Sequence, residues 1–219
     1  LTCRTIRRKV RLAAGTSLAA ILPAAVVGGL GYALQGSVDW IAAAALAVGI
    51  VIGAQVGSYL LARVPARALR WIFMAFLAAI AVSLWFTVPQ RDDRIEMGLL
   101  VALLLALTGA VTGVLSGLLG IGGGVIVVPV LIFFFGASDL VAKGTSLVML
   151  VPGSISGTIG NARRHNVDLR AAVILGVAAG ALAPLGTLLA QWIDPFWSNV
   201  SFSALLVLIL LQMLIREMR

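Results

Sequence analysis

Long apolar stretches, separated by short polar segments, dominate the chain. Six of them have about the 20 residues that a helix needs to cross a bilayer core of about 30 Å. These six stretches are 17–35, 40–62, 68–88, 98–118, 171–192 and 199–215. Two more, 124–135 after a run of glycines and 145–161 around Pro152, are shorter or interrupted, and we expect neither to be an unbroken spanning helix. The pattern predicts an all-α polytopic membrane protein with about eight hydrophobic helical elements.

The composition agrees with a membrane protein and excludes several soluble classes. Of 219 residues, 61% are hydrophobic and 11% are charged, whereas soluble domains are about 45–50% apolar and about 25% charged. This composition excludes a soluble enzyme, a coiled coil and a disordered tail, and it makes the lipid bilayer the expected surrounding. The net charge of +8 would suggest nucleic acid in a soluble chain. Here the basic residues flank apolar stretches as topology signals, so no nucleic-acid partner is expected.

The apolar stretches offer little to catalysis or metal binding. Charged residues lie outside the stretches or at their ends, and the chain has one cysteine, Cys3, and one histidine, His165. Charges within a membrane usually mark proton relays or catalytic centres, and one Cys with one His cannot build a metal cage. We therefore expect no catalytic residues, no metal and no cofactor, and the chain is predicted not to be an enzyme.

Basic residues also predict how the chain is oriented. A basic cluster precedes the first apolar stretch and arginines occupy 63–70 and 162–170, whereas 36–39 and 193–198 contain no Lys or Arg. The positive-inside rule then places both termini in the cytoplasm, in a multi-pass protein of the inner cell membrane. A signal peptide is the alternative for the basic start, but the first apolar stretch is long for one and further stretches follow at once.

The chain contains an internal repeat. Residues 13–39 match residues 142–168 at a constant offset of 129, with 11 of the 27 positions identical. The identities include a Gly-Thr-Ser-Leu run, two spaced glycines, and Pro23 with Pro152. Apolar bias alone would not align all of these in one register, so the repeat is a real feature of the sequence.

The loops of the two copies carry different charges. Gln35 and Gly36 align with Arg164 and His165, and the three arginines of 63–70 align with uncharged residues. Under the positive-inside rule, a loop that is cytoplasmic in one copy is external in the other. This predicts an inverted-topology repeat, the arrangement that in secondary transporters places a substrate site between the halves, near the middle of the membrane.

The repeat divides the chain into two parts. An incomplete first copy covers 1–96 with the basic N-terminus and three spans, and a second copy over 97–219 carries the glycine-rich segment. The counterpart of 98–135 is missing from the first copy, and the chain opens with Leu instead of Met. A fragment, an alternative start codon and a truncated gene product would each produce this pattern.

Three motifs of the second copy resemble one known family. They are the segment 113–131 with its Gly-Ile-Gly-Gly-Gly run, the sequence Ala-Lys-Gly-Thr-Ser-Leu over 142–147, and Asn-Val-Asp over 166–168 before a glycine-rich stretch. In this order they resemble the TauE/SafE family of membrane transporters, over about residues 13–215. The resemblance implies an inner-membrane permease without ATPase machinery that transports a small anion, with sulfite or an organosulfonate as the sulfur-containing candidates.

Residues in these motifs form a candidate anion site. The candidates are Gly120, Gly122, Gly123, Gly124, Lys143, Gly144, Thr145 and Ser146, with Thr16 and Ser17 from the first copy. Glycines let the backbone leave helix geometry and expose N–H groups, and the N-terminus of a broken helix presents a positive dipole end to an anion. We expect Thr145 and Ser146 to begin the next helix, where their hydroxyls cap it or donate to a ligand. Lys143 would add a positive charge.

Each candidate also has a structural alternative. The glycines could serve close helix packing, the hydroxyls could only cap helices, and Lys143 could be a headgroup anchor. For the whole chain, the main alternative is a non-transporting membrane scaffold or partner subunit, and an oligomer is compatible with either function. Outside the motifs, Gly49, Gly53 and Gly57 lie one turn apart on one helix face, which predicts a neighbouring helix packed closely against them.

Overall fold

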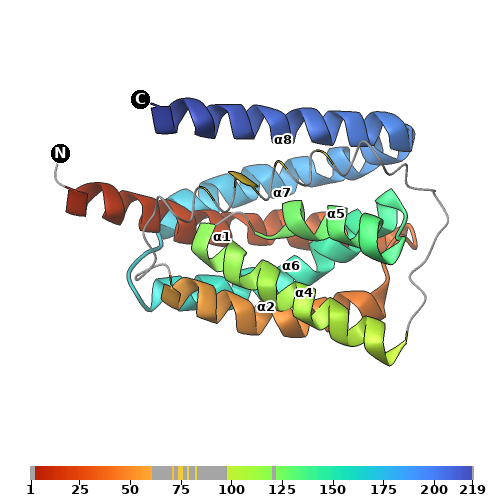
Figure 1. The fold of residues 1–219 in the computed structure, drawn as a ribbon, viewed down its shortest axis with the longest axis horizontal. Helices are drawn as coiled ribbons and strands as arrows, with labels where there is room; N and C mark the ends of the chain where they lie inside the picture. Colours follow the sequence, from red (N-terminus) through yellow and green to blue (C-terminus); the bar gives the residue numbers. More distant parts are fainter. Residues whose placement is uncertain are drawn as a thin grey trace.

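The computed structural model describes residues 3–60, 98–119 and 122–218, and the single positions 71, 74, 75, 78 and 82. Over these ranges the chain is built of helices and contains no strand (Figure 1). The helices are α1 (Cys3–Leu34), α2 (Trp40–Leu60), α4 (Leu99–Leu119), α5 (Gly124–Phe135), α6 (Asp139–Ala162), α7 (Leu169–Trp192) and α8 (Pro195–Met218). Most of the predicted helix over 68–88, and the predicted boundary at 96–97, lie outside the described residues.

Six of the helices are long and apolar enough to cross a membrane, and α5 is a shorter apolar helix. The spans are Leu12–Leu34, Trp40–Leu60, Leu99–Leu118, Asp139–Ala162, Leu169–Trp192 and Phe196–Ile215. This confirms the prediction of an all-α polytopic membrane protein with about eight hydrophobic elements.

One predicted interruption is wrong. α6 continues without a break through Pro152, although the proline and glycines of 145–161 predicted a broken element. The helix begins earlier than predicted, because Ser138 caps it by accepting a hydrogen bond from the backbone N–H of Val141 at 3.3 Å. The Thr145–Ser146 pair, predicted to begin this helix, therefore lies inside it.

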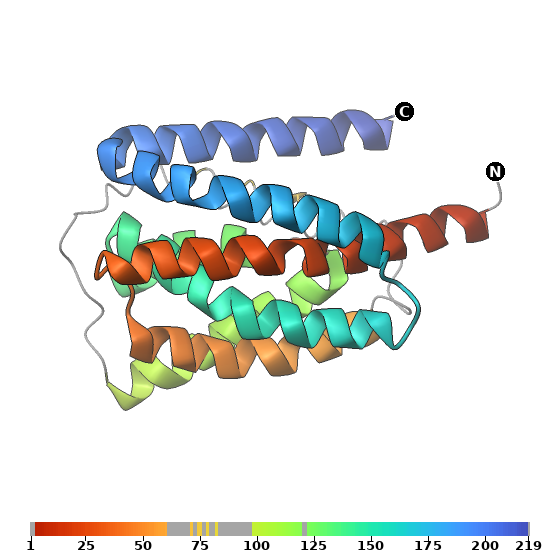
Figure 2. The same ribbon diagram turned by 180° about the vertical axis from the view of Figure 1, so that it is seen from behind.

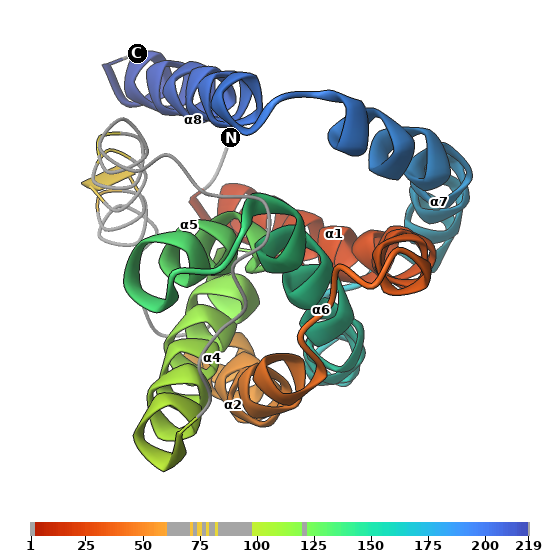
Figure 3. The same cartoon turned by 90° about the vertical axis from the view of Figure 1, so that its right-hand side faces the viewer.

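The two copies of the repeat are interleaved in space. α1 and α6 lie side by side, α7 packs on α1, and α2 packs on α6 (Figure 3). α4 covers the other side of α2, and α5 lies against α6. Seen from behind, α1, α6 and α7 run along the long axis of the molecule (Figure 2). The buried core between these helices includes Leu46, Ile50, Leu105, Leu131 and Met149.

α2 and α4 approach each other through glycines. A Cβ placed on Gly49 would overlap the carbonyl oxygen of Ala106, and one placed on Gly53 would overlap that of Ala110. α4 contributes glycines of its own to the same interface, namely Gly109, Gly113 and Gly117. The predicted close packing on the glycine face of α2 is confirmed, and α4 is the helix that packs there.

Paired contacts at the two ends of the bundle relate the copies to each other. Thr16 Oγ1 accepts a hydrogen bond from the backbone N–H of Asp168 at 2.9 Å, and Thr145 Oγ1 accepts one from the backbone N–H of Asp39 at 3.0 Å. At the repeat offset, Thr16 corresponds to Thr145 and Asp39 to Asp168, so the two bonds are equivalent. The start of each copy contacts the end of the other. α1 and α6 therefore run in opposite directions, which is the geometry that an inverted repeat predicts.

Candidate functional site

The N-terminus of α5 lies in the middle of the helix bundle. A Cβ placed on Gly122 would lie 2.8 Å from Ile21 of α1, and one placed on Gly124 would lie 3.3 Å from Leu150 of α6. Ile21 and Leu150 are both near the middle of their spans. With only 12 residues, α5 starts at this depth and runs to one end of α6. It is a half-helix whose N-terminus is directed at the centre of the membrane region.

Two glycines make this turn of the backbone possible. Gly122 and Gly123 both have a φ of 81°, in the left-handed region that side-chain-bearing residues rarely adopt. Gly123 caps α5 without a side-chain hydrogen bond, and its carbonyl accepts the first bonds of the helix, from the N–H groups of Ile126 and Val127 at 3.0 Å. The N–H groups of the two residues before these have no partner within the helix and form the positive end of its dipole.

Three buried hydroxyl groups belong to residues near this helix end. Thr112 and Ser116 of α4 face Gly123: their Cγ2 and Cβ atoms lie 2.7 and 3.7 Å from where a Cβ on Gly123 would be. Ser146 of α6 has its Oγ 3.9 Å from the Cβ position of Gly124 and donates to the carbonyl of its own helix at Lys143. The residues are 1%, 3% and 3% exposed, and Thr112 Oγ1 has no hydrogen-bond partner within the described part of the chain.

The charged residues whose side chains the structure describes lie near the ends of the helices or between them. Asp139 and Lys143 are on the first turns of α6, and Asp168 and Arg164 are in the segment that joins α6 to α7. Lys143 precedes Ser146 by about one helical turn and Leu150 by about two, which is about 5 Å and about 10 Å along the axis. The unpaired donors that the described residues place at the α5 N-terminus are therefore the backbone N–H groups of the helix itself.

The structure gives Lys143 a different set of contacts. Its ammonium group forms an ion pair with Asp139 at 3.1 Å and donates to Ser198 of α8 at 2.5 Å. Asp139 is 1% exposed, so this pair neutralises a buried carboxylate and links the start of α6 to α8. An additional contact between Lys143 and an anion stays a prediction.

Four further candidates take part in contacts toward the helix ends. Thr16 and Thr145 accept the two equivalent backbone hydrogen bonds, and a Cβ on Gly144 would overlap the carbonyl oxygen of Ser37. Ser17 Oγ donates to the carbonyl of Ala14 at 3.1 Å. The structure therefore brings Gly122, Gly123, Gly124 and Ser146 together and holds these four elsewhere. Their binding of an anion stays a prediction, and Gly120 lies outside the described residues.

Sequence reasoning missed the hydroxyls on α4. Thr108, Thr112 and Ser116 recur every four residues and so lie along one face of the helix. This spacing was visible in the sequence, but only the structure shows that the last two face the glycine run. An interior row of hydroxyls in an otherwise apolar span is the signal that would have found them.

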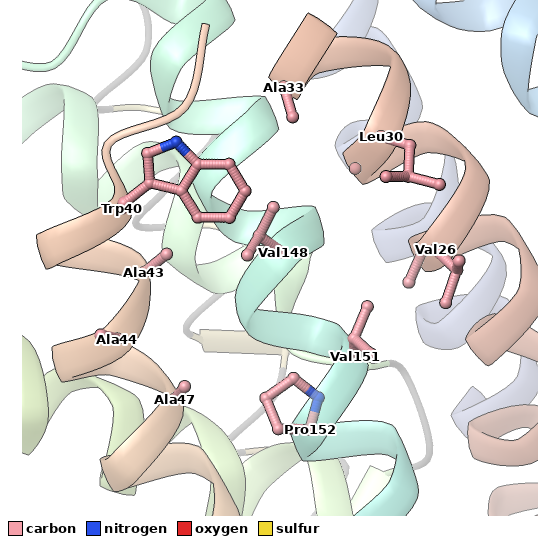
Figure 4. A pocket seen from close by; sticks show the side chains of 12 residues that line it. Val26, Leu30, Ala33, Trp40, Ala43, Ala44, Ala47, Val148, Val151 and Pro152 are labelled. Carbon is pink, nitrogen blue, oxygen red and sulfur yellow. The ribbon is translucent and has the colours of Figure 1, made fainter. Parts of the chain in front are cut away.

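A separate groove of about 420 Å³ lies between α1, α2 and α6. Its lining is apolar and includes Val26 and Leu30 of α1, Trp40 of α2, and Val148 and Val151 of α6 (Figure 4). The groove contains none of the candidate site residues. Because it offers almost no hydrogen-bond donor, it suits hydrocarbon and does not suit an anion.

Comparison with known proteins identifies the family. The family model described as "Sulfite exporter TauE/SafE" matches residues 3–102 and 104–219. The chain belongs to the TauE/SafE family. This confirms the resemblance drawn from the glycine run and the motifs that follow it. The chain that carries this half-helix therefore belongs to a family that is described as a sulfite exporter.

One curated relative is named as a probable membrane transporter. The "Probable membrane transporter protein YunE" of Bacillus subtilis (strain 168) is 26% identical to this TauE/SafE chain over 106 residues. The match spans 45% of this chain and 39% of the relative. No solved structure matches the chain.

Proposed function

We propose that this chain is a membrane permease for a small oxyanion, with sulfite or an organosulfonate as substrate. The observation that carries the proposal is the position of the α5 N-terminus, which Gly122 and Gly124 hold against the midpoints of α1 and α6. In transporters built from inverted repeats, discontinuous helices present such ends to anionic groups near the middle of the membrane. The family description supports the choice of a sulfur oxyanion.

The chemistry of the helix end supports anion binding. Irregular backbone at membrane depth is tolerated where it is buried in protein or lines a cavity, and the glycine run meets this condition. Unpaired N–H groups and the helix dipole favour negative charge, and the hydroxyl-bearing residues Thr112, Ser116 and Ser146 lie beside the same helix end. We propose that these groups replace part of the water around the anion as it crosses.

The orientation of the permease is part of the proposal. Arginines in 162–170 and at the N-terminus favour a cytoplasmic location for both termini in the inner membrane. The residues at the proposed site bind and orient the anion and carry out no covalent step. A non-transporting scaffold is not favoured, because the family model covers nearly the whole chain and describes an exporter.

The proposal is tested by crowding the helix end without changing charge. Gly123→Ala forces a side chain onto a residue with a φ of 81° and places its Cβ 2.7 Å from Thr112. Gly36→Ala is the matched control, because Gly36 has a φ of 69° but no atom of the described part of the chain lies within 4 Å of its Cβ position. We expect sulfite flux into proteoliposomes from the parent and from Gly36→Ala, and little or none from Gly123→Ala when equal amounts are reconstituted. Equal flux from all three proteins would contradict the proposed site.

A further inference from the structure

We infer that the groove between α1, α2 and α6 binds an acyl chain of a membrane phospholipid. This groove is separate from the proposed anion site, so the phospholipid is a second ligand, whichever anion the protein transports. Three features of the molecule lead to this occupant. They are the lining of the groove, its place in the membrane, and a difference between α2 and its counterpart α7.

The groove follows the helices for about two turns. α2 lines it with four residues at the spacing of one helix face, Trp40, Ala43, Ala44 and Ala47. α1 lines it at the same spacing with Val26, Gly29, Leu30 and Ala33. Val148, Val151 and Pro152 of α6 lie between the two helices (Figure 4). A stretch of seven residues rises about 10 Å along a helix axis, so the groove can hold an extended hydrocarbon chain.

The lining suits an apolar molecule and not water. An ordered water inside a protein needs about two to four polar partners, and an apolar cavity stays dry and takes apolar ligands instead. Among the described residues that line the groove, Trp40 is the only one whose side chain carries a polar atom. A molecule that fills this volume of about 420 Å³ is therefore a hydrocarbon.

The groove lies at the depth of the lipid chains and opens toward them. Its lining residues belong to the spans Leu12–Leu34, Trp40–Leu60 and Asp139–Ala162, and the side chains of Leu30 and Trp40 at its rim are exposed. Trp40 is the first residue of its span, and tryptophan rings gather where the membrane meets water. A phospholipid with its headgroup beside Trp40 can extend an acyl chain along the groove.

The positions of the glycines on α2 explain why this space is present. On α7, Gly176 and Gly180 lie against Pro23 of α1, and a Cβ on Gly176 would be 2.9 Å from the ring of Pro23. At the repeat offset, Pro23 corresponds to Pro152 and Gly176 to Ala47, and both of these counterparts line the groove. The glycines of α2 lie instead on the face that packs against α4. α2 is therefore held by α4, and a lipid chain fills the space beside Pro152.

Photolabelling locates the occupant in the unmodified protein. The protein is reconstituted into vesicles of phosphatidylethanolamine and phosphatidylglycerol that include a phospholipid with a diazirine in the middle of one acyl chain. After irradiation, the labelled residues are mapped by mass spectrometry. Leu182 of α7 is 64% exposed and reports ordinary lipid contact. We expect Val148 and Val151 to be labelled at least as strongly as Leu182, although both are only partly exposed.

Filling the groove should displace the lipid. Ala44→Leu combined with Ala47→Leu places two larger apolar side chains in the groove. Ala178→Leu combined with Ala181→Leu is the matched control, because these two alanines have the same spacing and are exposed on α7. Native mass spectrometry of the detergent-purified proteins should show phospholipid retained by the parent and the control. The groove variant should retain at least fivefold less, and its labelling at Val148 and Val151 should fall to a similar extent.

The possible outcomes are distinct. Labelling of Leu182 without labelling of residues 148–152 in the unmodified protein would overturn the lipid site, and this result does not depend on the folding of any variant. Equal phospholipid retention by the parent and the groove variant would also overturn it. Cross-links between the groove residues of two copies would show that a second copy fills the groove instead. None of these results bears on sulfite flux, which tests the proposed function separately.

Discussion

The two copies of the repeat make the same hydrogen bonds at the ends of their helices, but different helices pack against each copy. The Thr16–Asp168 and Thr145–Asp39 hydrogen bonds are equivalent, and so are the left-handed turns at Gly36 and His165, with φ of 69° and 56°. α4 covers α2 on the side away from α6. Half of the α2 span is buried, whereas only 22% of the equivalent α7 span is buried.

This difference distinguishes residues whose contacts occur in both copies from residues whose contacts occur in one copy alone. Gly57 of α2 lies against the backbone of α4, whereas Gly186, its counterpart on α7, has no atom of the described residues within 4 Å of its Cβ position. The α5 half-helix and Thr112 have no counterpart within the described residues. The duplicated contacts therefore form the common scaffold, and the proposed anion site belongs to the features of one copy.

The largest expected effect comes from filling the interface that only α2 has. Gly53→Ala places a Cβ onto the carbonyl oxygen of Ala110, and the two helices have to separate, at a cost of about 3 kcal/mol or more in unfolding free energy. Gly186→Ala is the matched control, because alanine favours helix by about 0.5–1 kcal/mol and meets no neighbour there among the described residues. Unfolding in detergent should show Gly53→Ala strongly destabilised. Similar stabilities for the two variants would show that the glycine face of α2 is not a tight interface.

A smaller loss of stability is expected from breaking the ion pair between Lys143 and Asp139. This pair is also present in one copy alone, since Ala14 stands where the second copy has Lys143. Lys143→Met leaves the buried carboxylate of Asp139 without its partner, which should cost about 3 kcal/mol. Asp139→Asn combined with Lys143→Met removes both charges and should recover much of that stability. A double variant no more stable than Lys143→Met would mean that the pairing of the two charges is unimportant.

The smallest effects, and the most closely matched, are expected at the duplicated end contacts. Thr16→Val and Thr145→Val each leave one backbone N–H without its acceptor, at a cost of about 1–2 kcal/mol. Because the bonds are 2.9 and 3.0 Å long and equivalent, the two losses in unfolding free energy should be similar. The serine variants at both positions keep the acceptor and serve as controls. A clear loss at one position and none at the other would argue against equivalent roles.

Much of the fold was predictable from the sequence, because span length and repeat register depend on residue order alone. The apolar runs predicted the spans, and the Gly-Thr-Ser-Leu identity predicted the repeat. The continuity of α6 was not predictable, since the cap at Ser138 and the packing around Pro152 depend on three-dimensional neighbours.

The candidate site was only partly predictable. The glycine run predicted a broken helix, and the structure places Gly122 and Gly123, both with positive φ, at the N-terminus of α5. The roles of Thr16 and Thr145 were not visible, because their partners lie more than a hundred residues away in sequence. Thr112 was missed because its contact with Gly123 joins two separate segments of the chain.

Two inverted copies that cross the membrane in opposite directions place equivalent turns on opposite sides of it. This arrangement is tested most directly by labelling single cysteines at equivalent turns. With Cys3 replaced by Ser, Gln35→Cys and His165→Cys each provide one exposed thiol. A membrane-impermeant maleimide should label residue 35 in intact cells and residue 165 only after the membrane is opened. Labelling of both from the same side would contradict the inverted arrangement.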